Sequence, residues 1–385
     1  MSLQLLTANH AAAIAAASAG RANRGARGFG SGVYPITPQT ECIEMLSGLD
    51  IEKGSVIPVE SEHSAMAVCM GFAMGGARTF TASSSNGLAY MAENVFAAGA
   101  YRLPIVMMAV NRTLGPPWNI WVDHGDTLLL RDCGWIQIYC EDNQEVHDLV
   151  IAAYRLAEDR RVLLPVMVCQ DAFVLSHTLM RTEIAEQEKV DRFLPLLDLA
   201  HRLHQKPITV GGLDFPHETE VHRRQLGEAM GRVGGVWKEV QAAFQAEFGR
   251  KLPDPVMPYR LDDAEVALVS MGTTASTVRV VVDQLRERGI KAGALRITMM
   301  RPFPGEAVAA ALAHVGKVGV LDRDVSPGLG GVLWAELRGA TGLPMVQGYM
   351  IGLGGGDVRP EHIARVADDL LGRTAVGQPM TVEVA

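Results

Sequence analysis

The acidic residue Glu62 stands at the predicted junction of a strand and a helix. The apolar residues 56–59 precede it, and apolar or small residues recur at helical spacing from Ala65 onward. Ser61 suits the N-cap of that helix, which places Glu62 in the first turn. Taken alone, this motif favours a plain structural role, in which the carboxylate complements the helix dipole.

A second candidate is the proline-bracketed loop over residues 32–41. Pro35 and Pro38 enclose Ile36 and Thr37 and stiffen the backbone. Pro38 suits the first position of a helix, so Thr37 is predicted to be its N-cap. The hydroxyl either caps the helix and does nothing else, or also faces an anionic ligand at the helix N-terminus.

Three further segments carry polar side chains at predicted loop positions. The hydroxyl-rich residues 81–87 could hold a small anion or a polar ring edge, or could be an ordinary solvated turn. Arg112 follows an apolar strand, and its guanidinium matches a carboxylate in bidentate geometry, although a structural ion pair is the alternative. His124, between Asp123 and Asp126, is a possible metal ligand or base, but a hydrogen-bonded structural histidine is favoured.

These candidates depend on a regular alternation of strands and helices in the first half of the chain. Apolar runs occupy residues 56–59, 79–82, 104–110, 136–139 and 163–169, and helical patterns occupy residues 9–19, 38–46, 62–76, 87–98 and 143–158. Alternation of this kind predicts a mostly parallel sheet with helices on both faces. Ligands of such sheets bind at the carboxyl ends of the strands, where the candidate loops are predicted to lie.

The rest of the chain divides into a connector and a second alternating block. Prolines punctuate the connector, and residues 218–248 are charged and helix-forming. A smaller α/β unit follows, with strands predicted at 265–270, 292–297 and 318–321. We therefore expect domains over residues 1–190 and 263–385, joined by a connector with a long helix over residues 191–262.

Composition limits the class of protein. With 48% hydrophobic residues, the 385-residue chain can bury a large core, and the net charge of −8 gives no basic stripe for nucleic acid. The N-terminus lacks a basic segment typical of a signal peptide, and the apolar run 11–17 is too short for a membrane span. The five cysteines are scattered without a Cys-x-x-Cys pair, which fits reduced cytoplasmic thiols and offers no ligand set for zinc or an iron–sulfur cluster.

Taken together, several motifs resemble one family. The matching segments are Tyr34-Pro35-Ile36-Thr37-Pro38, Ser61-Glu62-His63-Ser64-Ala65, Asn111-Arg112, residues 117–126, Gly134-Trp135-Ile136-Gln137, residues 163–168 and Leu321-Asp322-Arg323-Asp324. From about residue 8 to about residue 370 the chain resembles the alpha subunit of the 2-oxoacid:acceptor (ferredoxin-type) oxidoreductases, in the pyruvate, ketoisovalerate and phenylglyoxylate branch. The resemblance implies an α/β fold: a doubly wound parallel sheet that binds the pyrimidine half of thiamine diphosphate (ThDP), and a smaller transketolase C-terminal-like domain.

The resemblance also assigns roles to the candidate residues. Glu62 corresponds to the catalytic glutamate that hydrogen-bonds N1′ of the aminopyrimidine ring and favours its imino tautomer. Thr37 and Arg112 match positions that contact the carboxylate and oxo group of the substrate. The remaining expected cofactor contacts are Pro35, Ile36, Ser84, Ser85 and Asn86.

Two functional parts of such an enzyme are missing from the sequence. There is no Gly-Asp-Gly segment to hold Mg2+ and the diphosphate, and there are no cluster ligands. The resemblance implies that a beta-type subunit supplies the diphosphate half, the Mg2+ and a [4Fe-4S] cluster, while ferredoxin-like and gamma-type subunits complete the complex. We therefore expect no metal on this chain and activity only in the complex.

The expected reaction is oxidative decarboxylation of a 2-oxoacid with CoA to acyl-CoA and CO2, with electrons passed to the clusters of partner subunits. The expected substrate is pyruvate or a larger 2-oxoacid. The apolar residues 115–117 and 127–130 favour a larger, branched or aryl side chain, as in phenylglyoxylate, although ordinary packing also explains them. Two alternatives are a non-catalytic scaffold subunit and a component of a non-oxidative ThDP decarboxylase or synthase.

Overall fold

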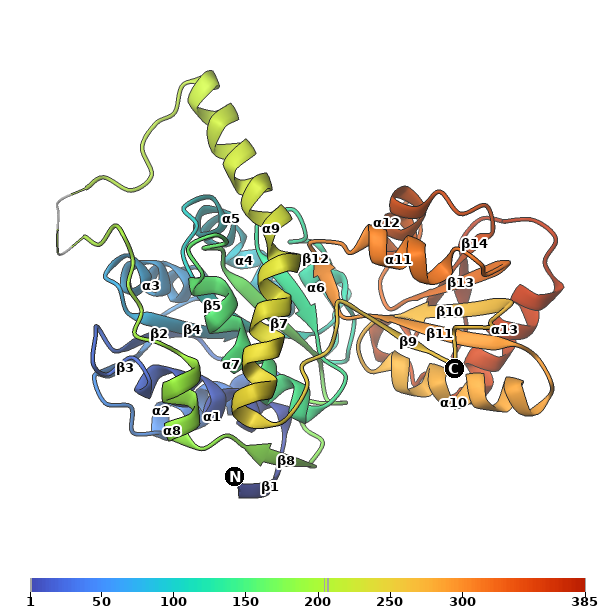
Figure 1. The fold of residues 1–385 in the computed structure, drawn as a ribbon, viewed down its shortest axis with the longest axis horizontal. Coiled ribbons are helices and arrows are strands. Elements are labelled where there is room, and N and C mark those ends of the chain that lie inside the picture. Colours follow the sequence, from blue (N-terminus) through green and yellow to red (C-terminus); the bar gives the residue numbers. More distant parts are fainter. Residues whose placement is uncertain (1, 204, 206–207, 385) are drawn as a thin grey trace.

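The computed structural model describes residues 2–203, 205 and 208–384 as two lobes side by side (Figure 1). The first lobe is built on a seven-stranded sheet with the order β12-β6-β7-β5-β4-β2-β3. Its strands are β2 (Phe29–Val33), β3 (Gly54–Pro58), β4 (Arg78–Ser83), β5 (Ile105–Asn111), β6 (Ile136–Tyr139), β7 (Val166–Asp171) and β12 (Met299–Arg301). All neighbouring pairs are parallel except β12 with β6, which confirms the predicted mostly parallel sheet.

Helices cover both faces of this sheet, as predicted for a doubly wound fold. One face carries α1 (Ala8–Arg21), α2 (Thr40–Gly48), α7 (Asn143–Glu158), α8 (Gln187–Phe193) and the second half of α9 (Pro216–Phe248). The other carries α3 (Glu62–Met74), α4 (Ser85–Tyr90) and α5 (Ala92–Ala100). Side chains of β5 alternate between the two cores: Val106 and Met108 point to the first, and Ile105 and Met107 to the second.

The second lobe is a six-stranded sheet with the order β15-β14-β13-β10-β11-β9. Its strands are β9 (Val256–Tyr259), β10 (Val266–Ser270), β11 (Ala292–Ile297), β13 (Lys317–Asp322), β14 (Val346–Ile351) and β15 (Met380–Val382), and its helices are α10 (Thr274–Glu287), α11 (Gly305–Leu312), α12 (Val332–Thr341) and α13 (Pro360–Gly372). The predicted limits at residues 190 and 262 stay a prediction. However, β9 lies in the predicted connector and pairs with β11, while β12 lies beyond residue 262 and joins the first sheet.

The long helix predicted at residues 218–248 is present as α9. Its buried residues begin at Ala229, and its first half projects beyond the first lobe (Figure 1). The helix predicted over residues 87–98 is instead two helices, α4 and α5, which are interrupted at Met91. The sequence prediction also missed the buried strand β2 and the small antiparallel pair of β1 (Ser2–Leu6) with β8 (Met180–Ile184).

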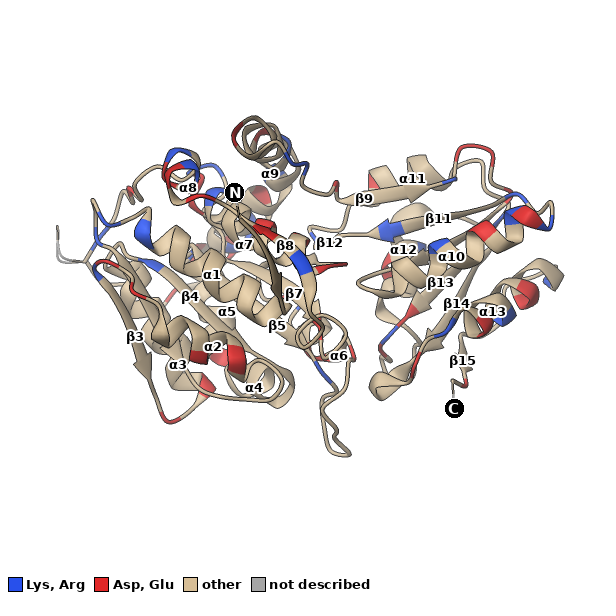
Figure 2. Cartoon of the chain, turned by 90° about the horizontal axis from the view of Figure 1, so that it is seen from below, with Lys and Arg blue, Asp and Glu red and all other residues tan. Residues whose placement is uncertain are grey.

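Charged residues are spread over both lobes, and blue and red segments occur along the same elements (Figure 2). No helix among the described residues is both long enough and apolar enough to cross a membrane.

Candidate functional site

Close packing of α3 on β2 brings the start of α3 to the carboxyl edge of the first sheet. A Cβ at Gly30 would lie 2.1 Å from the Phe72 ring, and a Cβ at Gly32 would lie 2.3 Å from the carbonyl oxygen of Ala65. Both positions therefore require glycine, because any side chain would push the helix away from the strand. The same two glycines weaken the strand pattern in the sequence, which explains why β2 was missed.

The predicted cap of α3 is confirmed, and Glu62 is its first residue. The Ser61 hydroxyl accepts a hydrogen bond from the amide of Ser64 at 3.2 Å. The Glu62 side chain is only 7% exposed, and this burial raises the pKa of its carboxyl. No other described residue donates a hydrogen bond to that carboxyl, so its oxygens can accept one from a ligand.

The loop after β4 approaches the Glu62 carboxyl at Gly87. A Cβ on Gly87 would lie 2.6 Å from Oε1 of Glu62 and 2.5 Å from Oγ of Ser83. The Ser83 hydroxyl is buried without a hydrogen-bond partner in the described structure. A buried carboxyl with a raised pKa and an orphaned hydroxyl thus both lie against Gly87, where no side chain would fit.

Thr37 does not cap a helix, so that prediction was wrong. Helix α2 begins at Thr40, and residues 37–39 form a turn that starts with the cis peptide between Thr37 and Pro38. The turn competes successfully with the helix because Gln39 donates its side-chain amide to the carbonyl of Tyr34 at 2.8 Å. Thr37 is instead exposed at the edge of the site.

Arg112 lies against Thr37, as the two proposed substrate contacts require. Its Nη1 donates to the carbonyl oxygen of Thr37 at 2.7 Å, and its Nε donates to that of Asn119 at 2.8 Å. The guanidinium stands 5.3 Å from the ring of Trp118. It forms no ion pair with a described carboxylate, and Nη2 has no described hydrogen-bond partner. Burial lowers the pKa of Arg112, against the opposing effect of the Asp126 charge, and the free Nη2 suits an anionic ligand.

The polar groups of Ser84, Ser85 and Asn86 hold the loop together. The Ser84 hydroxyl donates to the carbonyl of Val110 at 2.6 Å, and the Ser85 hydroxyl donates to that of Thr113. Asn86 exchanges two hydrogen bonds with the backbone of Gly115. These side chains are therefore engaged within the protein. Of the other two expected contacts, Pro35 is exposed and Ile36 is half-buried.

His124 is a structural residue, as the sequence favoured. Its Nε2 lies 2.8 Å from Oδ1 of Asp171, and both side chains are buried. Burial lowers the pKa of His124, but the charge and hydrogen bond of Asp171 outweigh this effect, so the pKa of His124 lies above its ordinary value. Asp171 also accepts from the backbone amide of Thr273, so the pair links the first lobe to the second. The described residues contain no group of three or more His, Cys, Asp or Glu side chains that could hold a metal ion.

Asp126 was missed as a functional candidate. It is fully buried beneath the loops that carry Ser85 and Arg112. No local pattern marks it, because its hydrogen-bond donors come from segments far apart in the sequence.

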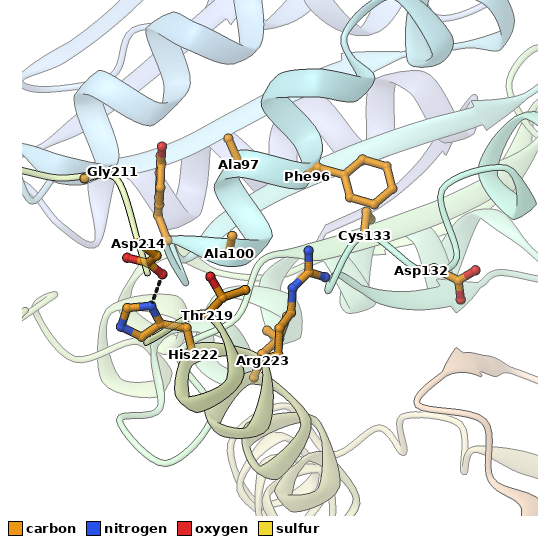
Figure 3. A pocket seen from close by; sticks show the side chains of 13 residues that line it. Phe96, Ala97, Ala100, Asp132, Cys133, Gly211, Asp214, Thr219, His222 and Arg223 are labelled. Carbon is orange, nitrogen blue, oxygen red and sulfur yellow. Dashed lines mark hydrogen bonds and ion pairs between the residues drawn. The ribbon is translucent and has the colours of Figure 1, made fainter. Parts of the chain in front are cut away.

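Two cavities lie outside the immediate surroundings of Glu62. One of about 500 Å³ lies between α5 and the first turns of α9, where the imidazole of His222 pairs with Asp214 at 2.6 Å (Figure 3). No predicted site residue lines it. The other, of about 510 Å³, lies between the lobes and is lined by Thr113 and Leu129 from the first lobe, and by residues 324–327 from the second. It therefore adjoins the Arg112 loop.

Family models match most of the chain. "Pyruvate flavodoxin/ferredoxin oxidoreductase, thiamine diP-bdg" matches residues 27–242, and "Pyruvate:ferredoxin oxidoreductase core domain II" matches residues 264–363. The pyruvate synthase subunit PorA of Thermotoga maritima is 46% identical over 352 residues, covering 88% of each chain. The ketoisovalerate oxidoreductase subunit VorA of Pyrococcus abyssi is 41% identical over 349 residues, covering 88% of this chain and 87% of the relative.

Two solved structures share the fold. A 2-oxoglutarate:ferredoxin oxidoreductase from Magnetococcus marinus superposes with a TM-score of 0.75 and 20% identity, covering 96% of this chain. The present chain spans 65% of the length of that chain. A split-gene transketolase matches with a TM-score of 0.53 and 14% identity over 95% of this chain and 98% of that one.

Proposed function

The chain belongs to the 2-oxoacid:ferredoxin oxidoreductases, as an alpha subunit with a ThDP-binding domain, and from this premise we propose its reaction. In complex with its partner subunits it converts a 2-oxoacid and CoA into acyl-CoA and CO2. The substrate is an aliphatic 2-oxoacid such as pyruvate or ketoisovalerate, because the relatives named above carry those substrates in their names. The residues of this chain supply the pyrimidine half of the active site.

The observation that carries this proposal is the state of the Glu62 carboxyl. It is buried, its pKa is raised by that burial, and no other described residue donates a hydrogen bond to it. These properties fit the pyrimidine ring of ThDP, which, when bound, supplies the electron sink for cleavage of the bond to the carboxylate. Glu62 holds a proton against N1′ of that ring, and the raised pKa keeps the proton available for transfer.

Arg112 and Thr37 bind the substrate in this proposal. The free Nη2 of Arg112 orients the carboxylate, and the exposed Thr37 hydroxyl reaches the oxo group. Pro35 and Ile36 form one wall of the cofactor site. Ser84, Ser85 and Asn86 form the opposite wall through their backbone, since their side chains are engaged in holding the loop.

Partner subunits supply what this chain lacks. We assign the diphosphate half of the cofactor site, the Mg2+ and a [4Fe-4S] cluster to a beta-type subunit, and further electron transfer to gamma-type and ferredoxin-like subunits. Trp118, 67% exposed, lies beside the Arg112 guanidinium, and Trp121, 48% exposed, lies against Phe173. Both exposed aromatic rings suit contact with the beta-type subunit. The purified chain alone should therefore show no 2-oxoacid turnover, while the reconstituted complex should. Turnover by the isolated chain would overturn the division of the site.

Replacement of Glu62 by Gln tests the catalytic assignment. Gln keeps the size of the side chain but cannot transfer the proton, so turnover by the assembled complex should fall at least about 100-fold. Glu60→Gln is the matched control, since Glu60 is two residues away and exposed. Gln keeps an oxygen for the hydrogen bond that Glu60 accepts from the Ser64 hydroxyl, so this variant should retain nearly full activity. Near-wild-type turnover by the Glu62→Gln complex would refute the assignment and favour a scaffold role.

A substrate panel separates the remaining alternatives. The complex should oxidise pyruvate or ketoisovalerate in a CoA-dependent reaction that reduces an electron acceptor. In the apolar run that suggested a larger substrate, Leu128 and Leu129 line the cavity between the lobes, and only Leu129 of the two is exposed. Leu130 is buried in the core. A clear preference for phenylglyoxylate would overturn the aliphatic assignment. CO2 release without CoA or an acceptor would identify a non-oxidative decarboxylase.

A further inference from the structure

Asp126 lies in the short helix α6 (Gly125–Leu128), and its carboxylate joins three segments of the first lobe. Its Oδ2 accepts hydrogen bonds from the backbone amides of Ser85 at 2.9 Å and Arg112 at 3.0 Å. Its Oδ1 accepts from the side-chain amide of Asn111 at 3.0 Å and from the amide of Thr127 at 2.8 Å. The side chain is fully buried, so these four donors replace its hydration.

The backbone amide of Ser85 lies at the start of α4, in the loop that faces Glu62. Ser85 has φ +51°, a left-handed conformation that a residue with a side chain rarely adopts, and it opens α4. Two residues later, Gly87 stands against the Glu62 carboxyl. The hydrogen bond from Ser85 to Asp126 holds this strained turn in place, and with it the distance between Gly87 and Glu62.

The backbone amide of Arg112 belongs to the residue that is proposed to bind the substrate carboxylate. Arg112 directly follows the last residue of β5, and its guanidinium reaches back to the carbonyl of Thr37. Among the described side chains, only Asp126 accepts a hydrogen bond from the backbone amide of Arg112. One carboxylate oxygen therefore fixes both the backbone that carries the arginine and the turn that faces the glutamate.

We propose that Asp126 is a positioning residue for the reaction, which sets the carboxylate-binding Arg112 and the Glu62-facing loop relative to each other. It contacts neither substrate nor cofactor and acts through these two backbone amides. The proposal rests on the proposed function, because it presupposes that Arg112 binds the substrate carboxylate. It goes beyond that function by adding a buried residue that does not contact the substrate and whose replacement should nevertheless weaken substrate binding.

A double-mutant cycle with Arg112 tests the proposal in the assembled complex. Asp126→Ala should raise KM for the 2-oxoacid about tenfold, the size expected for loss of hydrogen bonds to a buried charge. In the Arg112→Ala background the same change should raise KM less than about twofold, because no guanidinium remains to be displaced. KM for CoA should stay unchanged in both backgrounds.

Two further variants keep the test decisive. Asp126→Asn can keep one oxygen toward Ser85 and Arg112 by turning its amine toward Asn111, whose Oδ1 has no partner, so it should raise KM only about threefold. If Asp126→Ala does not assemble, the cycle is run with this variant. Thr127→Val is the control: it removes a hydroxyl 2.6 Å from Asn111 Nδ2 without touching Arg112, and should lower the melting temperature while leaving KM within about twofold.

The outcomes separate the two proposals. An equal rise of KM in both Arg112 backgrounds, or an unchanged KM with only a lower melting temperature, would show that Asp126 is merely structural. If Arg112→Ala itself leaves KM unchanged, the carboxylate-binding role of Arg112 fails, and the positioning role falls with it. A wild-type complex that turns over no 2-oxoacid refutes the proposed function itself.

Discussion

Replacing Gly87 by Ala should displace the Glu62 carboxyl without changing its charge. The added Cβ would lie 2.6 Å from Oε1 and 3.0 Å from Cδ of Glu62, and 2.5 Å from Oγ of Ser83. An ordinary contact begins at 3.4 Å, so Oε1 must move by about 0.8 Å. The carboxyl is the end of a flexible side chain and will move more easily than the backbone of α4.

This displacement sets the expected magnitude. A misplacement of about 1 Å at a reacting group costs up to about 100-fold in rate, so Gly87→Ala should lower kcat by about 10- to 100-fold, or about 1.4–2.7 kcal/mol of barrier. Overpacking against the Glu62 carboxyl and the buried Ser83 hydroxyl should also cost some stability. Gly87 has ordinary helical φ, and alanine favours a helix over glycine by up to about 1 kcal/mol, which offsets part of that cost. The melting temperature separates a loss of activity from unfolding.

The assay is kcat for 2-oxoacid oxidation by the assembled complex at saturating ThDP, with the melting temperature measured in parallel. Gly71→Ala provides the control, because Gly71 lies in the same helix as Glu62 and its Cβ would meet no atom within 4 Å. The control should keep kcat within about twofold of the wild type. A Gly87→Ala complex with unchanged kcat would refute the view that the position of the Glu62 carboxyl limits the reaction.

Three further predictions concern the stability of the isolated chain, measured by urea unfolding. Glu158→Gln should cost about 3 kcal/mol, because it leaves the fully buried Arg78, now held at 2.7 Å by that carboxylate, without its counter-charge. Asp171→Asn should cost about 3 kcal/mol at pH 7 by leaving a buried His124 unpaired. Burial raises the pKa of Asp171, but the charge and hydrogen bond of His124 outweigh it and lower the pKa to about 2. The stabilisation is therefore present above pH 4, and the difference in unfolding free energy between wild type and variant should narrow by about 2 kcal/mol as the pH falls from 4 toward 2. An unchanged difference would contradict the assignment. Gly30→Ala should cost about 1–3 kcal/mol through overpacking, and a fully stable variant would show that α3 can shift freely on β2.

Local signals in the sequence were enough to place most elements and the catalytic candidate. Helix α7 has the predicted limits because its apolar spacing lies within sixteen consecutive residues and its N-cap, Asp142, directly precedes them. Ser61 caps α3 as predicted, since a cap requires only neighbours in sequence. By contrast, the predicted cap at Thr37 was wrong, because the hydrogen bond from the Gln39 side chain to Tyr34 stabilises a turn that no helix signal reveals. Strand β2 failed because its glycines serve the packing of α3 rather than strand propensity.

The sequence by itself determined that this chain carries a glutamate at the start of a helix and an arginine after a buried strand. These properties are local, and they sufficed for the family resemblance. Only the tertiary structure decided that Arg112 contacts Thr37, seventy-five residues away. It also decided that the hydroxyls of Ser84 and Ser85 donate to backbone carbonyls of this chain. It alone placed Asp126 beneath both halves of the site. Such contacts arise when parallel strands end at one edge of a sheet, and their distance along the chain hides them from any sequence pattern.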